Sequence, residues 1–426
     1  MLDQPVARRR PLACAAAVLL AVLACTPTAP TASPTASPTS APSATAVPTG
    51  TPVDVQALYR EIEDQVVAIR GLQPKQRLEP TVIDGPTLTA NLIAQFDKDN
   101  KPADLAADEA LLTALRLLEP GTSLRTTYLD LQGSQVLGYY SPDDKALFVV
   151  SRSGTIGPIE KATFAHEFTH ALQDQHFDLS SLHIDDRTNG DRALARLSLV
   201  EGDAVATQTD WMVSHLTADD IAQIVAEASD PAVLAAFARA PAILRETSLF
   251  PYQAGLAFVG ALRGQGGFDA VNDAFGKPPA STAQILHPAT YGGGDVQVED
   301  LSRYAEDAGT GWQERREDTL GQLILRVWLR ENGVRGADAS TAAAGWASDR
   351  VALLEDVAGA HLVVLFTTWS TTTDADEFEA AARTALSGEP SKVVIRVSTE
   401  QVDFVFGTDA AAMNRIADQI RTAGCC

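Results

Sequence analysis

The stretch that decides the fold is His166-Glu167-Phe168-Thr169-His170, an HExxH sequence inside a segment with a helical pattern. Side chains four residues apart lie on one face of a helix, about 5–6 Å apart at Cβ, so His166 and His170 can bind one metal ion together. Glu167 projects beside them, where its carboxylate can accept a proton from water. The motif therefore predicts a divalent-metal site with two histidine ligands and a glutamate base.

The sequence around the motif predicts a buried helix over residues 157–175. Pro158 suits the first turn of a helix, where its missing N–H would have no partner. Apolar residues cover more of the circumference than a surface helix shows, namely Ile159, Ala162, Phe164, Ala165, Phe168, Ala171 and Leu172. Buried polar groups need partners, and a metal ion would satisfy both histidines. The alternative is that the histidines are hydrogen-bonded core residues and Glu167 faces solvent.

Glu201 is the first candidate for a third ligand, because catalytic zinc usually has three protein ligands and leaves one position for water. It follows Val200 in the most apolar part of a predicted helix that begins near residue 193. Gly202, the next residue, costs about 1 kcal/mol relative to alanine in a helix, but it permits a neighbouring helix to approach closely. We therefore expect Glu201 to complete the site where two helices meet. The alternative is a Glu201 that faces solvent.

His176 is the second candidate, since it follows His170 by six residues, the spacing of the third histidine in HExxHxxGxxH. That pattern requires glycine at position 173, where the chain leaves the helix in a left-handed conformation. Gln173 stands there instead. The pattern also expects a methionine turn, whereas Met212 and Met413 lie in helix-like contexts. Glu201 is therefore the predicted ligand and His176 the alternative.

HExxH followed by a glutamate on a second helix resembles the gluzincin class of zinc metallopeptidases. The phrases HEFTHALQDQHFDL and LVEGDA, and the segments 251–275 and 278–291, are similar to those of a group of little-characterised bacterial HExxH proteins. The resemblance covers roughly residues 135–291. It implies an α+β, predominantly helical fold, with His166, His170 and Glu201 binding Zn²⁺ and Glu167 as the catalytic base. The interval between His170 and Glu201 contains no NExxxD phrase, so no particular gluzincin family is indicated.

Supporting residues are predicted around this site. Asp174, one turn after His170, is a candidate second-layer partner of the metal ligands. Residues 135–150 predict a hairpin around Ser-Pro-Asp-Asp-Lys. The resemblance implies that a strand near the motif helix borders the cleft and pairs with an extended substrate. Tyr139 and Tyr140 are then candidate cleft residues, unless they serve only packing.

His287 and Tyr291 are candidate proton donors to the tetrahedral intermediate of peptide hydrolysis. Both precede three glycines that mark a turn. His287 also stands before Pro288, so a purely structural role at a helix end is the alternative. Of the two, His287 is the predicted catalytic residue.

The first 25 residues predict a lipoprotein signal peptide. Arg8-Arg9-Arg10 precede an apolar run from Leu12 to Ala24, which is too short to span a bilayer but suits a signal-peptide core. Val22-Leu23-Ala24-Cys25 resembles a bacterial lipobox, whose cysteine becomes acylated. Residues 26–52 are almost wholly Thr, Pro, Ser and Ala and predict a disordered tether. Ordinary secretion and an uncleaved anchor are the alternatives.

Composition narrows the classes of partner. The net charge of −22 argues against nucleic acid, whose phosphates require a cationic surface. After cleavage before Cys25, the remaining cysteines are Cys25, Cys425 and Cys426, which form no disulfide framework. We therefore expect a core-stabilised domain without a nucleic-acid partner.

The rest of the chain divides into two predicted parts, a metallopeptidase-like domain over 53–299 and an α+β subdomain over 300–426. Helices are expected at 53–71, 87–96, 103–118, 191–275 with three prolines, 314–331, 375–386 and 410–422. Strands are expected at 360–368, 392–397 and 402–406.

These patterns favour an extracytoplasmic zinc peptidase that is tethered to the bacterial membrane through lipidated Cys25 and acts on a peptide or protein. One alternative is a non-catalytic, zinc-stabilised binding lipoprotein. Another is a helical lipoprotein in which the motif arose by chance.

Overall fold

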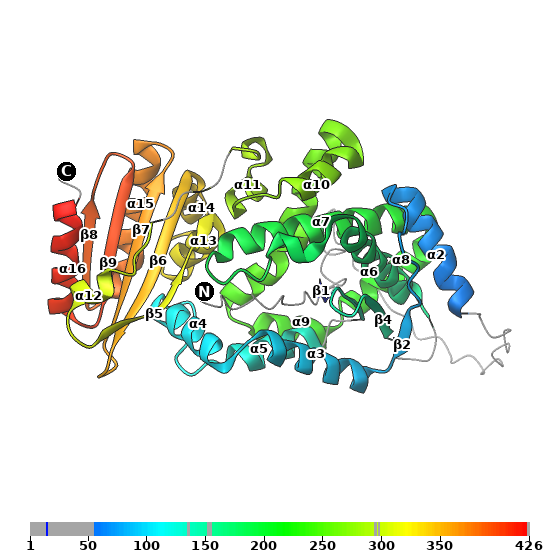
Figure 1. The fold of residues 1–426 in the computed structure, drawn as a ribbon, viewed down its shortest axis with the longest axis horizontal. Helices are drawn as coiled ribbons and strands as arrows, with labels where there is room; N and C mark the ends of the chain where they lie inside the picture. Colours follow the sequence, from blue (N-terminus) through cyan, green and yellow to red (C-terminus); the bar gives the residue numbers. More distant parts are fainter. Residues whose placement is uncertain are drawn as a thin grey trace, which may run out of the picture.

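The computed structural model describes residues 14–15, 55–133, 137–150, 156–293, 296 and 299–423 (Figure 1). Cys25, the tether over 26–52 and the pair Cys425–Cys426 lie outside the described residues. Within the described part, no helix is both long and apolar enough to cross a membrane.

The chain is α+β and predominantly helical, as the sequence predicts. The helices are α2 (Val55–Arg70), α3 (Gly85–Asp99), α4 (Pro102–Ala114), α5 (Leu124–Gly133), α6 (Pro158–Phe177), α7 (Gly190–His215), α8 (Ala218–Ala228), α9 (Pro231–Arg239), α10 (Ala242–Gly276), α11 (Thr282–Leu286), α12 (Tyr304–Ala308), α13 (Gly321–Glu331), α14 (Gly336–Ala344), α15 (Thr372–Ala385) and α16 (Ala410–Ala423). The strands are β1 (Cys14–Ala15), β2 (Thr81–Ile83), β3 (Gly138–Ser141), β4 (Ala146–Val150), β5 (Trp312–Asp318), β6 (Trp346–Asp356), β7 (His361–Trp369), β8 (Ser391–Arg396) and β9 (Gln401–Gly407).

The small sheet, of order β1-β3-β4-β2, carries the predicted hairpin. β3 and β4 pair antiparallel, with Tyr139 opposite Phe148 and Tyr140 opposite Leu147. Gly138 packs closely on both β4 and α6, because a Cβ there would lie 2.9 Å from Phe148 O and 3.2 Å from Thr163 Cγ2. The absence of one side chain thus lets β3 lie close to its partner strand and to the HExxH helix.

The five-stranded antiparallel sheet, of order β5-β6-β7-β9-β8, lies at the other end of the molecule (Figure 1). Its central strand β7 is buried on both faces, since successive side chains point to opposite sides. Val363 and Leu365 join one core with α13, α14 and α15. Leu362 and Val364 join a second core with α12 and α16. Because the side chains of β7 alternate between these two cores, the sheet is covered by helices on both faces.

The helix expected over 314–331 is wrong in its first part. Residues up to Asp318 belong to the edge strand β5, and α13 begins only at Gly321. The charged run in β5 is exposed at Glu314 and Arg315 and partly buried from Arg316 to Asp318, so its burial shows no alternation, and the strand pairs with β6 through its backbone ladder. Asp349 of β6 then accepts the N–H groups of Leu320 and Gly321 at 2.8 and 2.7 Å and fixes the start of α13.

The predicted helix over 157–175 is α6, and it is buried on all sides over most of its length. Phe164 stacks on Tyr59 of α2 with ring centroids 4.3 Å apart. The expected helical region 191–275 is α7 to α10. Pro231 and Pro241 coincide with helix starts, whereas Pro251 lies inside α10 and does not end it.

The predicted close approach at Gly202 is confirmed, and its partner helix is α10 rather than the HExxH helix. A Cβ on Gly202 would lie 2.3 Å from the backbone of Gly255, and one on Gly255 would lie 2.2 Å from Ser198 O. Two glycines therefore bring the backbones of α7 and α10 into direct contact. This contact sets the position of α7, and with it the position of Glu201.

We expect Gly202→Ala to lower the free energy of unfolding by about 1–3 kcal/mol, because the added methyl group overpacks a backbone contact. Denaturant unfolding measures this loss. Gly260→Ala is the matched control, since Gly260 is an exposed α10 residue with open space around it, and it should be neutral or stabilising. Equal stability of both variants would contradict the assigned contact.

Candidate metal centre

Three predicted ligands meet between α6 and α7. His166 Nε2 lies 3.2 Å from Glu201 Oε2, and His170 Nε2 lies 3.4 Å from the same oxygen. The two Nε2 atoms are 3.0 Å apart. All three residues are at most 2 % exposed. Of the described residues, these form a group able to hold a metal ion.

The spacing of these atoms fits a tetrahedral metal ion. Ligand atoms about 2.0–2.2 Å from a tetrahedral centre are about 3.3–3.6 Å apart, and the observed edges of 3.0, 3.2 and 3.4 Å are close to this. Nitrogen and oxygen donors suit zinc, among other divalent metals. Three protein ligands leave the fourth tetrahedral position to another molecule. The geometry therefore accommodates a metal, whose identity it does not fix.

Gln173 fixes the protonation and orientation of His170. The Gln173 Nε2 group donates to Val200 O at 3.0 Å and to Asp203 Oδ2 at 2.9 Å, and both of these atoms are acceptors. The amide oxygen must therefore face His170, where it lies 2.8 Å from Nδ1. A carbonyl oxygen only accepts, so Nδ1 carries the proton. In the neutral ring, the Nε2 lone pair then points at the metal position, as a ligand requires.

A buried ion pair holds Gln173 in turn. Arg70 of α2 contacts Asp203 through Nε at 2.8 and 3.0 Å, and both side chains are fully buried. Arg70 Nη2 also donates to Asn272 Oδ1 at 2.7 Å. Phe268 lies 4.6 Å below the guanidinium group. The chain of contacts from Arg70 through Asp203 and Gln173 to His170 joins α2, α7 and α6 behind the metal ligand.

The electrostatics of the group already favour a cation. Burial opposes a charge on His170, but the carboxylates of Glu201 and Glu167 outweigh it and raise the pKa of His170 to about 9. Burial opposes the Glu201 charge too, but the two histidines lower the pKa of that carboxyl to about 2. Burial lowers the pKa of His166. One proton on His170 thus neutralises Glu201 at the place where a metal ion would do so.

Glu167 lies beside the ligands at the edge of β3. Its Oε2 accepts the Tyr140 N–H at 2.9 Å, and the side chain is fully buried. The Tyr140 hydroxyl donates to Asp174 at 2.7 Å, and Lys145 Nζ lies 2.5 Å from the same carboxylate. Asp174 therefore supports the strand next to Glu167. The sequence predicted that Asp174 would contact a metal ligand, but the residue that contacts His170 is Gln173.

The other candidates have different surroundings. His176 Nε2 lies 2.7 Å from Gln73 O, and His176 belongs to none of the metal-binding groups in the described part. His287 Nε2 lies 3.0 Å from Gln322 Nε2. The Tyr291 hydroxyl donates to Lys277 O at 2.7 Å. Tyr139 stacks on Phe148 and accepts from Asn91, so its side chain has a packing role.

Tyr252 of α10 was not predicted as a site residue, although it is near the ligands. Its ring centroid lies 6.4 Å from that of His166, and the residue is 8 % exposed. The only sequence signal was its place, directly after Pro251 in one of the phrases that carry the family resemblance.

Comparisons with known proteins match only parts of the chain. Residues 302–421 match a family described as a domain of unknown function, DUF8575, and this segment contains the five-stranded sheet but none of the metal ligands. No curated protein matches. A solved structure from Chloroflexus aurantiacus, described as a candidate hydrolase with a novel fold, is similar at 18 % identity and a TM-score of 0.35, over 57 % of this chain and 90 % of that one.

We expect Gln173→Ala to weaken divalent-metal binding about 10- to 100-fold, because His170 loses the group that orients it. His176→Ala, on the same helix, is the matched control and should bind zinc as the wild type does. Isothermal titration with zinc measures both. If His176→Ala abolished binding and Glu201→Ala did not, His176 would be the third ligand.

Proposed function

We propose that this protein is a zinc-dependent peptidase, anchored outside the bacterial cytoplasm through lipidated Cys25. The observation that carries the proposal is the convergence of His166, His170 and Glu201 within 3.4 Å, with Glu167 beside them. A purely structural zinc normally has four protein ligands, and a base next to it would have no purpose. Three ligands with an adjacent carboxylate support a hydrolytic centre.

Each residue has a defined task in this proposal. The Nε2 atoms of both histidines and the Glu201 carboxylate bind the metal. When bound, zinc polarises the scissile carbonyl and makes water acidic enough to attack it at neutral pH. Glu167 accepts the proton of that water and passes it to the leaving amine. The Tyr140 N–H at 2.9 Å holds the Glu167 carboxylate in place for both transfers.

The edge of β3 supports a peptide as the substrate. The two residues of β1, which belong to the predicted signal peptide, pair antiparallel with β3 there, with Cys14 opposite Tyr140 and Ala15 opposite Tyr139. An extended backbone can therefore hydrogen-bond to the strand that contacts Glu167. A substrate peptide in the same place would have its carbonyl groups close to the metal ligands, which favours peptide hydrolysis over other hydrolase chemistry.

Glu167→Gln should abolish peptide hydrolysis while zinc content and thermal stability stay near wild type, since the amide keeps the size of the side chain but cannot accept the proton. A mixed-peptide cleavage assay followed by mass spectrometry, together with metal analysis, measures this. Wild-type protein treated with a chelator should lose the same activity. Undiminished hydrolysis by Glu167→Gln would exclude the proposed base.

Tyr252 and His287 are competing candidates for the group that stabilises the tetrahedral intermediate. Tyr252 lies next to His166, so Tyr252→Phe should lower kcat about 10²- to 10³-fold with little change in KM or zinc content. His287→Ala tests the residue that the sequence predicted in the same assay. If only His287→Ala lowers kcat, the assignment of Tyr252 is wrong.

One observation favours a second function, a zinc-stabilised binding protein without turnover. The metal ligands and Glu167 are at most 2 % exposed, as in a structural site. This function predicts that metal removal unfolds the protein and that peptides bind without being cleaved. Thermal unfolding with and without chelator, measured beside the cleavage assay, separates the two functions.

A further inference from the structure

One ring nitrogen of the candidate ligand His166 has no assigned partner. Its Nε2 atom faces the other two ligands, 3.0 Å from His170 Nε2 and 3.2 Å from Glu201 Oε2. Its Nδ1 atom is buried and forms no hydrogen bond of normal geometry with any described residue. A neutral imidazole that offers Nε2 to a metal ion carries its proton on Nδ1. Because a buried N–H without an acceptor is destabilising, His166 needs an acceptor on this side of the ring.

Gln208 of α7 is the side chain in position to supply that acceptor. It is buried, and its Nε2 donates to Ala162 O of α6 at 3.0 Å. A carbonyl oxygen only accepts, so the amide nitrogen must face Ala162 and the amide oxygen is left to accept a hydrogen bond elsewhere. Ala162 lies one helical turn before His166 on the same face of α6. The amide group of Gln208 is therefore held beside the turn that carries the ligand.

The electrostatics of the ring identify which atom of Gln208 acts on it. Burial lowers the pKa of His166, and the side chains of Glu201 and Gln208 offset part of this effect. A hydrogen-bonding group raises the pKa of a histidine by accepting from the ring, so the contribution of Gln208 comes from its oxygen. Glu201 lies on the Nε2 side. The amide oxygen of Gln208 is thus the acceptor for the Nδ1 side.

A second glutamine makes the equivalent contacts at the other histidine. Gln173 of α6 donates to Val200 O of α7 and places its oxygen 2.8 Å from His170 Nδ1. Gln208 of α7 donates to the backbone of α6 in turn. Each helix therefore sends one amide to the backbone of the other, with the amide oxygen directed to the ring of a ligand. Both amides are neutral, so they hold the rings without adding a further buried charge.

We infer that Gln208 is the positioning residue of His166, whose Nδ1–H it accepts through its amide oxygen when the ring binds a metal ion. The inference deepens the proposed function and rests on its metal centre, but it requires no turnover. Gln208 acts on the metal only through His166. Without this acceptor the ring is buried with an unpaired N–H and is less firmly oriented, so the affinity of the site for a metal should fall.

The test is the affinity for Co²⁺, which binds the same ligand types as zinc and is followed by its visible absorption. Gln208→Met fills the same space without an acceptor and should raise the dissociation constant about 10- to 100-fold. Gln208→Glu keeps an oxygen for Nδ1 and should bind at least about tenfold more tightly than Gln208→Met. Both variants lose the amide nitrogen that donates to Ala162, so a purely structural role predicts the same loss in both.

Gln175→Met is the matched control, because it makes the same substitution on α6 away from the ligands. The Gln175 amide bridges the helix to the backbone of Lys75 and Gln76. This variant should bind Co²⁺ as the wild type does.

A measurement on the wild type keeps the inference testable if Gln208→Met fails to fold. In zinc-loaded protein with isotope-labelled histidine, NMR should show a slowly exchanging Nδ1–H proton on both ligand histidines. Such a proton on His170 alone would overturn the assignment of Gln208.

The remaining outcomes separate the inference from the proposed function. Wild-type affinity in Gln208→Met overturns the inference, and so does an equal loss of affinity in Gln208→Met and Gln208→Glu. If the wild type binds neither Co²⁺ nor Zn²⁺, the proposed function and the inference both fail. If both metals bind with the expected pattern but no peptide is cleaved, the inference stands and only the proposed function fails.

Discussion

The burial of one carboxylate between two imidazoles is the constraint on which the helical body depends. Removing a charged carboxylate from water costs several kcal/mol unless a cation and hydrogen bonds compensate. Glu201 is 2 % exposed, and both groups that face it at 3.2 and 3.4 Å are histidine nitrogens. A single positive charge in the centre of this triangle satisfies all three residues. The packing around α6 and α7 can therefore be understood as the structure needed to hold that charge.

Rigid placement of the ligands follows from contacts on both sides of α7. On one side, Gly202 and Gly255 put α7 against α10 at backbone distance. On the other side, Gln173 of α6 binds Val200 O and Asp203, which lie one residue before and two residues after Glu201 in α7. The Arg70–Asp203 pair is buried in this second contact, so loss of either charge would leave the other unpaired in the core. Ligand geometry and helix packing are thus held by the same residues.

The motif, the third ligand and the close approach at Gly202 could be predicted from sequence because each is a local signal: a spacing, a polar residue in an apolar helix and a glycine beside it. The role of Gln173 could not. The pattern HExxHxxGxxH expects glycine at position 173, so from sequence Gln173 is only a mismatch to that pattern. Its role depends on a hydrogen bond to Asp203, 30 residues away. Tyr252 reaches His166 only through the packing of α10, which no local pattern encodes. The edge strand β5 was mistaken for helix because its charged residues carry no alternation.

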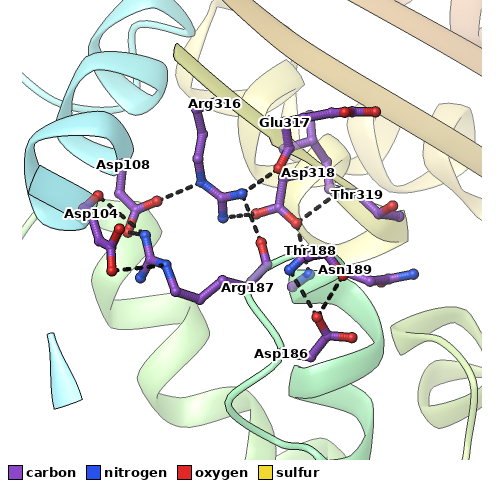
Figure 2. Close-up of polar contacts among 12 residues, drawn as sticks. Asp104, Asp108, Asp186, Arg187, Thr188, Asn189, Arg316, Glu317, Asp318 and Thr319 are labelled. Atoms are coloured by element: carbon purple, nitrogen blue, oxygen red, sulfur yellow. Dashed lines mark hydrogen bonds and ion pairs between the residues drawn. The ribbon is translucent and has the colours of Figure 1, made fainter. Parts of the chain in front are cut away.

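The C-terminal part of the chain packs against the helical part, although it holds none of the candidate metal ligands. Leu320 and Ile324 belong to the segment that matches a family of unknown function, yet they line a pocket together with Leu194 and Leu197 of α7. Arg316 of β5 binds Asp108 of α4, and Leu320 shares one hydrophobic core with Leu111 of the same helix. This core contains residues from both sides of residue 300, and the contact of Arg316 with Asp108 in Figure 2 spans the same division. The five-stranded sheet therefore fixes the position of α4 in the helical part of the chain.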